Sequence, residues 1–208
     1  HCEQNRIDDH GLKFPHGDED KLLYLAQIMA FLKPGQHYHY IQTASFGKLL
    51  RDPDNEKLEG DCNQIVTLYI YLFSLKFPLD LLQIKLLPEH VCLHFRGIDI
   101  EATNGTFQKY EDDKQILPVT EIISTNLLDL TDFREEVQRI EPQIIVKSSQ
   151  LAYAISSLHS IVAKNLDIAY RNLAIDSITH KNFERAIFYA EKGSDRKLLN
   201  NVYHNVAV

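Results

Sequence analysis

The chain has 208 residues, of which 44% are hydrophobic and 25% charged, the ordinary composition of a globular protein with a sizeable core. Its net charge of −7, without clusters of Lys and Arg, argues against a nucleic-acid partner, because neutralising phosphates requires grouped basic side chains. The longest largely apolar run, 65–75, is shorter than the roughly 20 residues that span a bilayer, so we expect no transmembrane segment.

The cysteines and the chain ends are the features of the sequence that bear on disulfide bonding and cellular location. Cys2, Cys62 and Cys92 do not make a disulfide framework in a chain of this size. The sequence starts at His1 without Met, which predicts a processed or trimmed N-terminus, and a removed signal peptide is compatible with that start. The partly apolar run 201–208 predicts a boundary inside a larger protein. We expect a cytoplasmic location and leave export after signal removal open.

The first half of the chain predicts helices. Periodicity begins after the acidic segment 17–20, and Pro34-Gly35 ends it. A second helix is predicted over 41–50. A third follows Glu59-Gly-Asp-Cys62 without a break and runs to about residue 75; its length of about fourteen residues exceeds that of a typical strand and favours a buried helix.

The middle of the chain predicts antiparallel strands. The segments 81–86, 90–95 and 98–103 are short and rich in apolar and β-branched residues. Arg96-Gly97 predicts a tight turn that pairs about Phe95 with about Ile98.

Beyond Pro118 the pattern is helical again. Helices are predicted over 148–164, 167–179 and 182–192, the last two forming a pair around His180-Lys181. Helices, then strands, then helices indicate an α+β fold. We predict a first domain over 1–145 and a helical segment over 146–208.

Three residues have the chemistry of a cysteine nucleophile with its base and its orienting acid. Cys62 opens a helix, where the helix dipole stabilises a thiolate, and Gly60 before it lets the backbone bend and a substrate approach. His90, at the start of a strand, can be the base, and Glu101, on the next strand, can orient it. Asp99 lies on the same strand face as Glu101 and is a rival for the acid.

The order of these motifs resembles the transglutaminase-like core superfamily, which has a papain-like fold. The resemblance covers roughly 40–107 and is carried by Gly60-Asp-Cys62, by His90-Val-Cys-Leu-His-Phe95 and by Ile98-Asp-Ile-Glu-Ala-Thr103. It implies Cys62 as nucleophile and His90 as base of acyl transfer or amide hydrolysis on a peptide or protein, as in peptidases, amidases and transglutaminases. Glu101 stands where the family has Asp.

The chain contains no Trp, whose indole helps to hold the oxyanion in eukaryotic transglutaminases. The resemblance therefore assigns the oxyanion to the Cys62 N–H and to an upstream side chain, Gln42. We expect no cofactor and no metal: His37 and His39 could form half of a zinc site, but no further ligands occur at suitable spacing.

The C-terminal helical pair resembles a tetratricopeptide repeat, and the bacterial branch that combines such a segment with the core is the nearest likeness. Ala174 and Ala186 would let two helices pack closely, with Phe183 beside them. Position 198, where the repeat usually has Pro, is Leu. The alternative function is a catalytically silent core that acts as a protein-binding module, with this helical tail contacting a protein partner.

Overall fold

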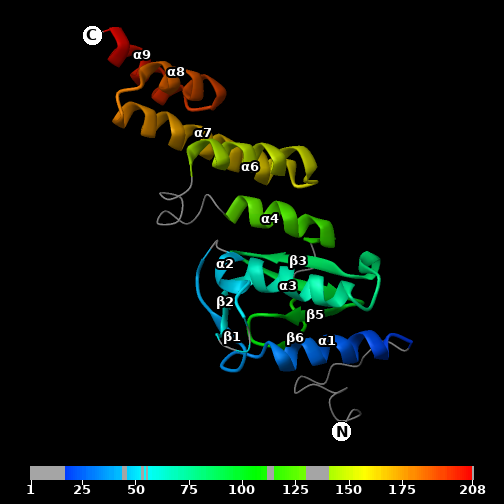
Figure 1. Ribbon diagram of the computed structural model, residues 1–208. Coiled ribbons are helices and arrows are strands. Elements are labelled where there is room, and N and C mark those ends of the chain that lie inside the picture. Colours follow the sequence, from blue (N-terminus) through cyan, green and yellow to red (C-terminus); the bar gives the residue numbers. More distant parts are fainter. Residues whose placement is uncertain are drawn as a thin grey trace. The chain divides into compact units, whose positions relative to one another are not determined.

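The computed structural model describes residues 17–43, 46–52, 54, 56–111, 115–129 and 141–207. They form a mixed α+β protein that divides into two compact units, one up to Ile122 and one from Ile123 onward (Figure 1). The α+β class predicted from the sequence is confirmed. Cys2 lies outside the described residues. Among the described helices, none is both long and apolar enough to cross a membrane.

The division after Ile122 differs from the predicted boundary at 145/146. That boundary lies inside helix α6 (Pro142–Ile155), and both Ile145 and Val146 belong to the core of the second unit. Cutting there would separate α6 residues that pack into the same hydrophobic cluster.

The first unit is built around one buried helix and one sheet. Helix α1 (Glu19–Phe31) begins inside the acidic segment 17–20, two residues earlier than predicted, and ends before Pro34 as predicted. Helix α3 (Cys62–Ser74) is the predicted buried helix, and three of its large side chains, Ile65, Tyr69 and Phe73, are fully buried. A 3₁₀ turn over Leu79–Leu81 leads into the sheet, and another over Val119–Glu121 leaves it.

The main sheet is antiparallel and has five strands, in the order β6-β5-β4-β3-β7. Its strands are β3 (Gln83–Leu87), β4 (His90–Phe95), β5 (Ile98–Glu101), β6 (Thr106–Gln108) and β7 (Ile116–Pro118). The predicted pairing of Phe95 with Ile98 is confirmed, and Arg96 and Gly97 both adopt positive φ, as a tight hairpin turn requires.

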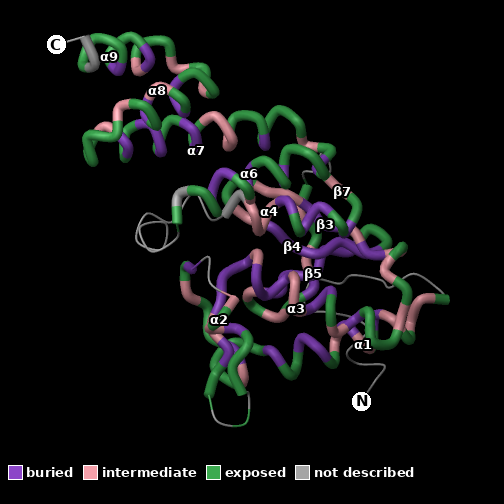
Figure 2. The backbone as a smooth tube through the Cα atoms, turned by 45° about the horizontal axis from the view of Figure 1, so that its top comes forward, coloured by how far each residue is buried: buried purple, intermediate pink, exposed green. Residues whose placement is uncertain are grey.

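The two faces of this sheet differ in chemistry because side chains alternate along each strand. Val91, Leu93 and Phe95 of β4 point to one face and join the hydrophobic core with α3; the Phe95 ring lies 6.5 Å from that of Phe73. His90, Cys92 and His94 point to the other, which we call the polar face; its further members are Lys85, Asp99 and Glu101. Figure 2 shows that positions on both faces of the central strands are buried.

The helix predicted over 41–50 is wrong in its first part. Strand β1 (Tyr38–Tyr40) ends just before it, residues 41–43 continue without helix, and helix α2 covers only Phe46–Leu49. Strand β1 pairs in parallel with β2 (Leu58–Gly60), and the Ile41 N–H donates to the Gly60 carbonyl at 3.0 Å. Such short strands depend on a partner remote in sequence, so periodicity did not reveal them; β7, which pairs with β3, was missed for the same reason. Strand β6 forms a hairpin with β5, but its three residues are too few to show an alternating pattern.

The second unit is helical. Its described elements are α4 (Ile122–Asp129), which begins at the division between the units, α6, α7 (His159–Thr179), α8 (Phe183–Lys192) and α9 (Arg196–Ala207). The single helix predicted over 148–164 is two helices, because Ser156 is extended and its hydroxyl accepts the Leu158 N–H at 3.0 Å.

The helical pair predicted around His180 is confirmed. Helix α7 ends at Thr179, Lys181 adopts a positive φ of 57°, and the Asn182 side chain caps α8 by accepting the Arg185 N–H. Ala174 and Ala186 are both fully buried in the core that the two helices share. Small side chains at these positions therefore allow the close packing of α7 and α8.

Replacing Ala186 with Leu should destabilise the second unit by about 1–3 kcal/mol, because added methylenes in a closely packed core force side chains and backbone apart. Urea unfolding monitored by circular dichroism measures this change. Ala163→Leu, at an exposed position of α7, is the matched control and should change stability by no more than about 0.5 kcal/mol. Equal effects of the two substitutions would show that Ala186 is not at a tight contact.

Candidate active site

Cys62 is the first residue of α3, and a complete capping box fixes that helix start. The Asp61 carboxylate accepts the backbone N–H groups of Asn63, at 2.9 Å, and Gln64, at 3.5 Å. In return, the Gln64 side chain accepts the Asp61 N–H at 2.9 Å. The sulfur of Cys62 therefore lies in the first turn, at the positive end of the helix dipole. The residue is 8% exposed.

Gly60 is required for space rather than for an unusual backbone angle. Its φ is not positive, but a Cβ at this position would lie 3.2 Å from Gln64 Cβ and 3.4 Å from Leu49 Cδ1. Its carbonyl accepts the Tyr38 hydroxyl at 2.9 Å. Gly60 thus holds the strand end against the capping box that positions Cys62.

His90 contacts both of its predicted partners. Its Nε2 lies 2.7 Å from Glu101 Oε2, and its interaction with the Cys62 side chain is the largest cause of its raised pKa. Because Nε2 faces Glu101, Nδ1 is the ring nitrogen that remains for the sulfur. The His90 side chain is 26% exposed, whereas that of Glu101 is 3% exposed. His90 is thus reachable from solvent, and the carboxylate that contacts it is not.

The sheet register explains why a glutamate fits here. Leu93 pairs with Ile100, so continuing the register sets Glu101 opposite Cys92, with His90 the next residue of β4 on the polar face. A diagonal pair of this kind is separated by about 7–8 Å between Cα atoms, within reach of long side chains. The extra methylene of Glu, relative to the Asp of the family pattern, covers part of that distance.

The charges of the pair stabilise one another. The hydrogen bonds with Cys62 and then Glu101, against the opposing effect of burial, raise the pKa of His90 to about 10. Burial by itself would raise the pKa of Glu101, but hydrogen bonds from His90, Thr103 and Tyr110 outweigh it, and that pKa is lowered. At neutral pH the site therefore holds an imidazolium beside a carboxylate.

Asp99, the rival acid, belongs to a different network. Its Oδ1 lies 2.6 Å from His94 Nδ1, and its Oδ2 lies 3.0 Å from the Lys85 ammonium. The His94 Nε2 accepts the Gly97 N–H, so Nδ1 carries the proton that Asp99 accepts. Of the two carboxylates, Glu101 is the one that the structure joins to His90.

Cys92 and His94 are both buried on the polar face. Burial raises the pKa of the Cys92 thiol, with the charges of Asp99 and Glu101 adding to the effect. Cys92 is therefore held as an unreactive thiol.

Gln42 lies two residues beyond β1, just as Cys62 lies two residues beyond β2. The parallel pairing ends at Tyr40 and Gly60, with the Ile41 N–H donating to the Gly60 carbonyl, and Gln42 itself is exposed. Its role at an oxyanion stays a prediction.

Two residues that the sequence did not assign contact the acid. The Thr103 hydroxyl donates to Glu101 Oε1 at 2.6 Å, and the Tyr110 hydroxyl donates to Oε2 at 2.8 Å. Thr103 was part of the recognised motif and could have been assigned; Tyr110 follows β6 with no local signal. Within the described part of the chain, no group of three or more His, Cys, Asp or Glu residues could hold a metal ion.

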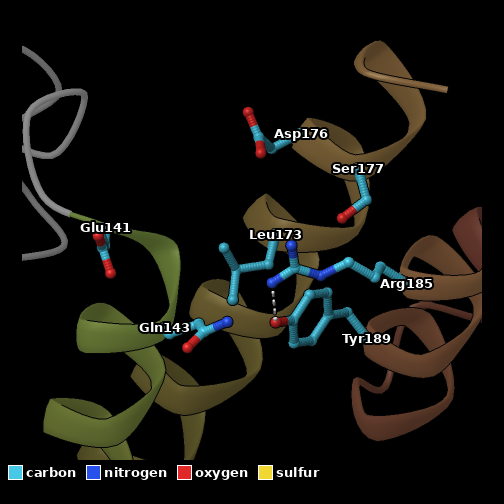
Figure 3. A pocket seen from close by; sticks show the side chains of 7 residues that line it. All are labelled: Glu141, Gln143, Leu173, Asp176, Ser177, Arg185 and Tyr189. Carbon is cyan, nitrogen blue, oxygen red and sulfur yellow. Dashed lines mark hydrogen bonds between the residues drawn. The ribbon is translucent and has the colours of Figure 1, made fainter. Parts of the chain in front are cut away.

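The helical unit contains a pocket of about 290 Å³ between α6, α7 and α8 (Figure 3). The side chains of Gln143, Arg185 and Tyr189 converge near Leu173, and the Arg185 guanidinium donates to the Tyr189 hydroxyl at 3.4 Å. The remaining lining residues are polar or acidic: Glu141, Asp176 and Ser177.

Comparison of the chain with models of known protein families, with curated proteins and with solved structures finds no match to any of them.

The raised pKa of His90 predicts how stability depends on pH. A group with a pKa near 6.5 in the unfolded chain and about 10 in the folded protein stabilises the fold fully below pH 6.5, and this contribution is lost as pH rises through 10. The pKa of Glu101 is lowered from 4.5, so Glu101 is charged throughout this window. His90→Gln should therefore cost more unfolding free energy at about pH 6 than at about pH 9.5. Urea unfolding of both proteins at the two pH values measures it.

Ile70→Val is the control, because it shortens a buried side chain of α3 without removing a titrating group. Its cost of about 0.5–1.5 kcal/mol should be equal at both pH values. A His90→Gln cost that is equally independent of pH would contradict the charged state inferred for His90.

Proposed function

We propose that the chain is a cysteine-dependent acyl-transfer enzyme or amide hydrolase with a transglutaminase-like, papain-type core. The observation that carries the proposal is the position of His90, whose Nε2 lies 2.7 Å from Glu101 Oε2 and whose pKa is raised by its interaction with the Cys62 side chain. A nucleophile, a base and a buried orienting acid in this order are the parts that thiol acyl transfer requires. The motif order over about 40–107 agrees with the same reading.

The reaction follows from the groups present. The Cys62 thiolate forms a bond from Sγ to the carbonyl carbon of an amide or ester, and the carbonyl π electrons move to oxygen. When the carbonyl re-forms, the bond to the leaving group breaks and the His90 imidazolium donates a proton to the departing nitrogen or oxygen. The product of this half-reaction is a thioester on Cys62, with His90 neutral.

The second half-reaction reverses the proton movement. Water or an amine attacks the thioester carbon, and His90 accepts a proton from that nucleophile. Sγ leaves as a thiolate beside the regenerated imidazolium. Glu101 accepts the Nε2–H throughout and keeps Nδ1 directed at the sulfur. Water gives hydrolysis and an amine gives transfer, and a peptide or protein is the proposed substrate.

A direct test is capture of the thioester. Incubation of the protein with p-nitrophenyl acetate should add one acetyl group, detected by intact mass and located on Cys62 by peptide mapping. Cys62→Ser should abolish that thioester, whereas Cys92→Ala should retain it. Acetylation spread over lysines, with none on Cys62, would contradict the proposed reaction.

A second candidate function is protein binding through the helical unit. It is favoured by the pocket between α6, α7 and α8 and by the tetratricopeptide-like pairing of α7 with α8. In this alternative the Cys62 site is silent, and the same core serves as a scaffold.

Thiol reactivity separates the two candidates. At about pH 6–7, Cys62 should react with iodoacetamide at least about tenfold faster than Cys92, because a helix start and an imidazolium favour its thiolate. His90→Ala should lower the Cys62 rate strongly, and Glu101→Gln should lower it less. Mass spectrometry of each cysteine peptide against time measures these rates.

Cys92 in the same molecule is the internal control, because it is a fully buried thiol. It should stay slow until the protein is denatured. If Cys62 reacts no faster than Cys92 and its alkylation rate is unchanged by His90→Ala, the thiol is structural and the binding-module alternative is favoured.

A further inference from the structure

The Glu101 carboxylate receives more hydrogen bonds than the reaction itself requires. Oε1 accepts the Thr103 N–H at 3.1 Å and the Thr103 hydroxyl at 2.6 Å. Oε2 accepts the Tyr110 hydroxyl at 2.8 Å and lies 2.7 Å from His90 Nε2. Thr103 is two residues away on the same segment, whereas Tyr110 reaches Oε2 from the segment after β6. The oxygen that holds His90 is therefore shared with one other side chain.

The backbone of Tyr110 is held from both sides by a buried ion pair. Its N–H donates to Asp99 Oδ2 at 2.7 Å, and its carbonyl accepts the Lys85 ammonium at 2.7 Å. Lys85 and Asp99 lie 3.0 Å apart, and each side chain is 1% exposed. The Lys85 ammonium also lies 5.9 Å from the centre of the Tyr110 ring.

We propose that Tyr110 is a positioning residue of the Cys62–His90 site, and that the Lys85–Asp99 pair fixes its backbone so that its hydroxyl holds Glu101 against His90. The inference rests on the proposed function and adds a residue to the same site. It also gives a role to the buried Lys85–Asp99 pair, whose two side chains hydrogen-bond to the Tyr110 backbone.

Geometry supports a positioning role for this hydroxyl. A carboxylate at the end of a long side chain can rotate about its last torsion, and a second donor on Oε2 limits that rotation. The Tyr110 hydroxyl remains a donor at neutral pH, since burial and then the hydrogen bond to Glu101 raise its pKa. The other groups whose charge interacts with Glu101 are Tyr69 of α3 and Cys92 of β4.

The test is Tyr110→Phe, which removes the hydroxyl and keeps the ring. It also keeps the two hydrogen bonds that join the Tyr110 backbone to Lys85 and Asp99, which we call the backbone clamp. Two measurements are made on the 208-residue protein: NMR titration of ¹⁵N-labelled histidine, with the His90 signal identified by its loss in His90→Gln, and the Cys62 alkylation rate. The pKa of His90 should fall by about one unit, which corresponds to about a tenfold change in equilibrium. The alkylation rate at about pH 6.5 should fall about three- to tenfold.

Tyr24→Phe is the matched control. The Tyr24 hydroxyl donates to the Leu72 carbonyl at 3.1 Å, near the opposite end of α3 from Cys62, so its loss tests a structural hydrogen bond of the same unit. It should lower the melting temperature without changing either readout. A Tyr110→Phe protein whose His90 pKa is unchanged or raised would overturn the positioning role.

Asp99→Asn tests the clamp. In the otherwise unaltered protein it should lower the pKa of His90 by less than Tyr110→Phe does, and in the Tyr110→Phe background it should add nothing, because it acts through Tyr110. An additive effect would overturn the clamp.

The two proposals fail separately. A wild-type protein that forms no thioester refutes the reaction, while the His90 titration still reports on Tyr110. A wild-type protein that forms the thioester, with both readouts unchanged in Tyr110→Phe, refutes only the positioning role.

Discussion

A buried carboxylate must be hydrogen-bonded, and several segments of the first unit supply the donors that Glu101 needs. Leaving an ionised carboxyl group in an apolar environment without partners is strongly unfavourable, so such a group exists only where several donors converge. Here the donors come from β4, from the residues that follow β5 and from the segment beyond β6. The position of His90, and through it the environment of Cys62, depends on this convergence.

The polar face carries two histidine–carboxylate pairs with different consequences. In His94–Asp99 both side chains are buried, and each partner has further contacts that hold it in place. In His90–Glu101 the acid is buried but the histidine is partly exposed and also contacts Cys62. The first pair therefore has the features of a structural network, whereas the histidine of the second pair is reachable from solvent. Lys85 and Tyr110 join the two, because the clamp on Tyr110 is made by Asp99 while its hydroxyl binds Glu101.

The second unit is held together by packing between helices. Its core lies between helices and combines small, aromatic and branched aliphatic side chains: Ala169, Ala174, Ala186, Ala190, Tyr170, Tyr189, Ile145, Val146, Leu173, Leu199 and Val202. The turn between α7 and α8 is set locally, by the positive φ of Lys181 and by the Asn182 cap. Helix pairs of this type bury one face and leave others exposed.

Local patterns in the sequence were sufficient for much of this protein. The start of α3 at Cys62, the turn at Arg96-Gly97 with its Phe95–Ile98 pairing, and the break at His180 all follow from residues within a few positions of one another. Helix caps, hairpin turns and side-chain periodicity are short-range effects, so they can be read from a single sequence. The break at Ser156 was missed because apolar spacing continued across it.

Only the tertiary structure decided which carboxylate serves His90. Asp99 and Glu101 share one face of one strand, so side-chain alternation could not show which of them contacts His90. The diagonal register places Glu101 beside His90, and Asp99 is hydrogen-bonded to His94 and Lys85 instead. The hydrogen bond from Lys85 to the Tyr110 carbonyl and the strand pair β1–β2 depend in the same way on segments that are distant in the chain. Such contacts arise when remote segments pack together, and no local propensity encodes which of them will meet.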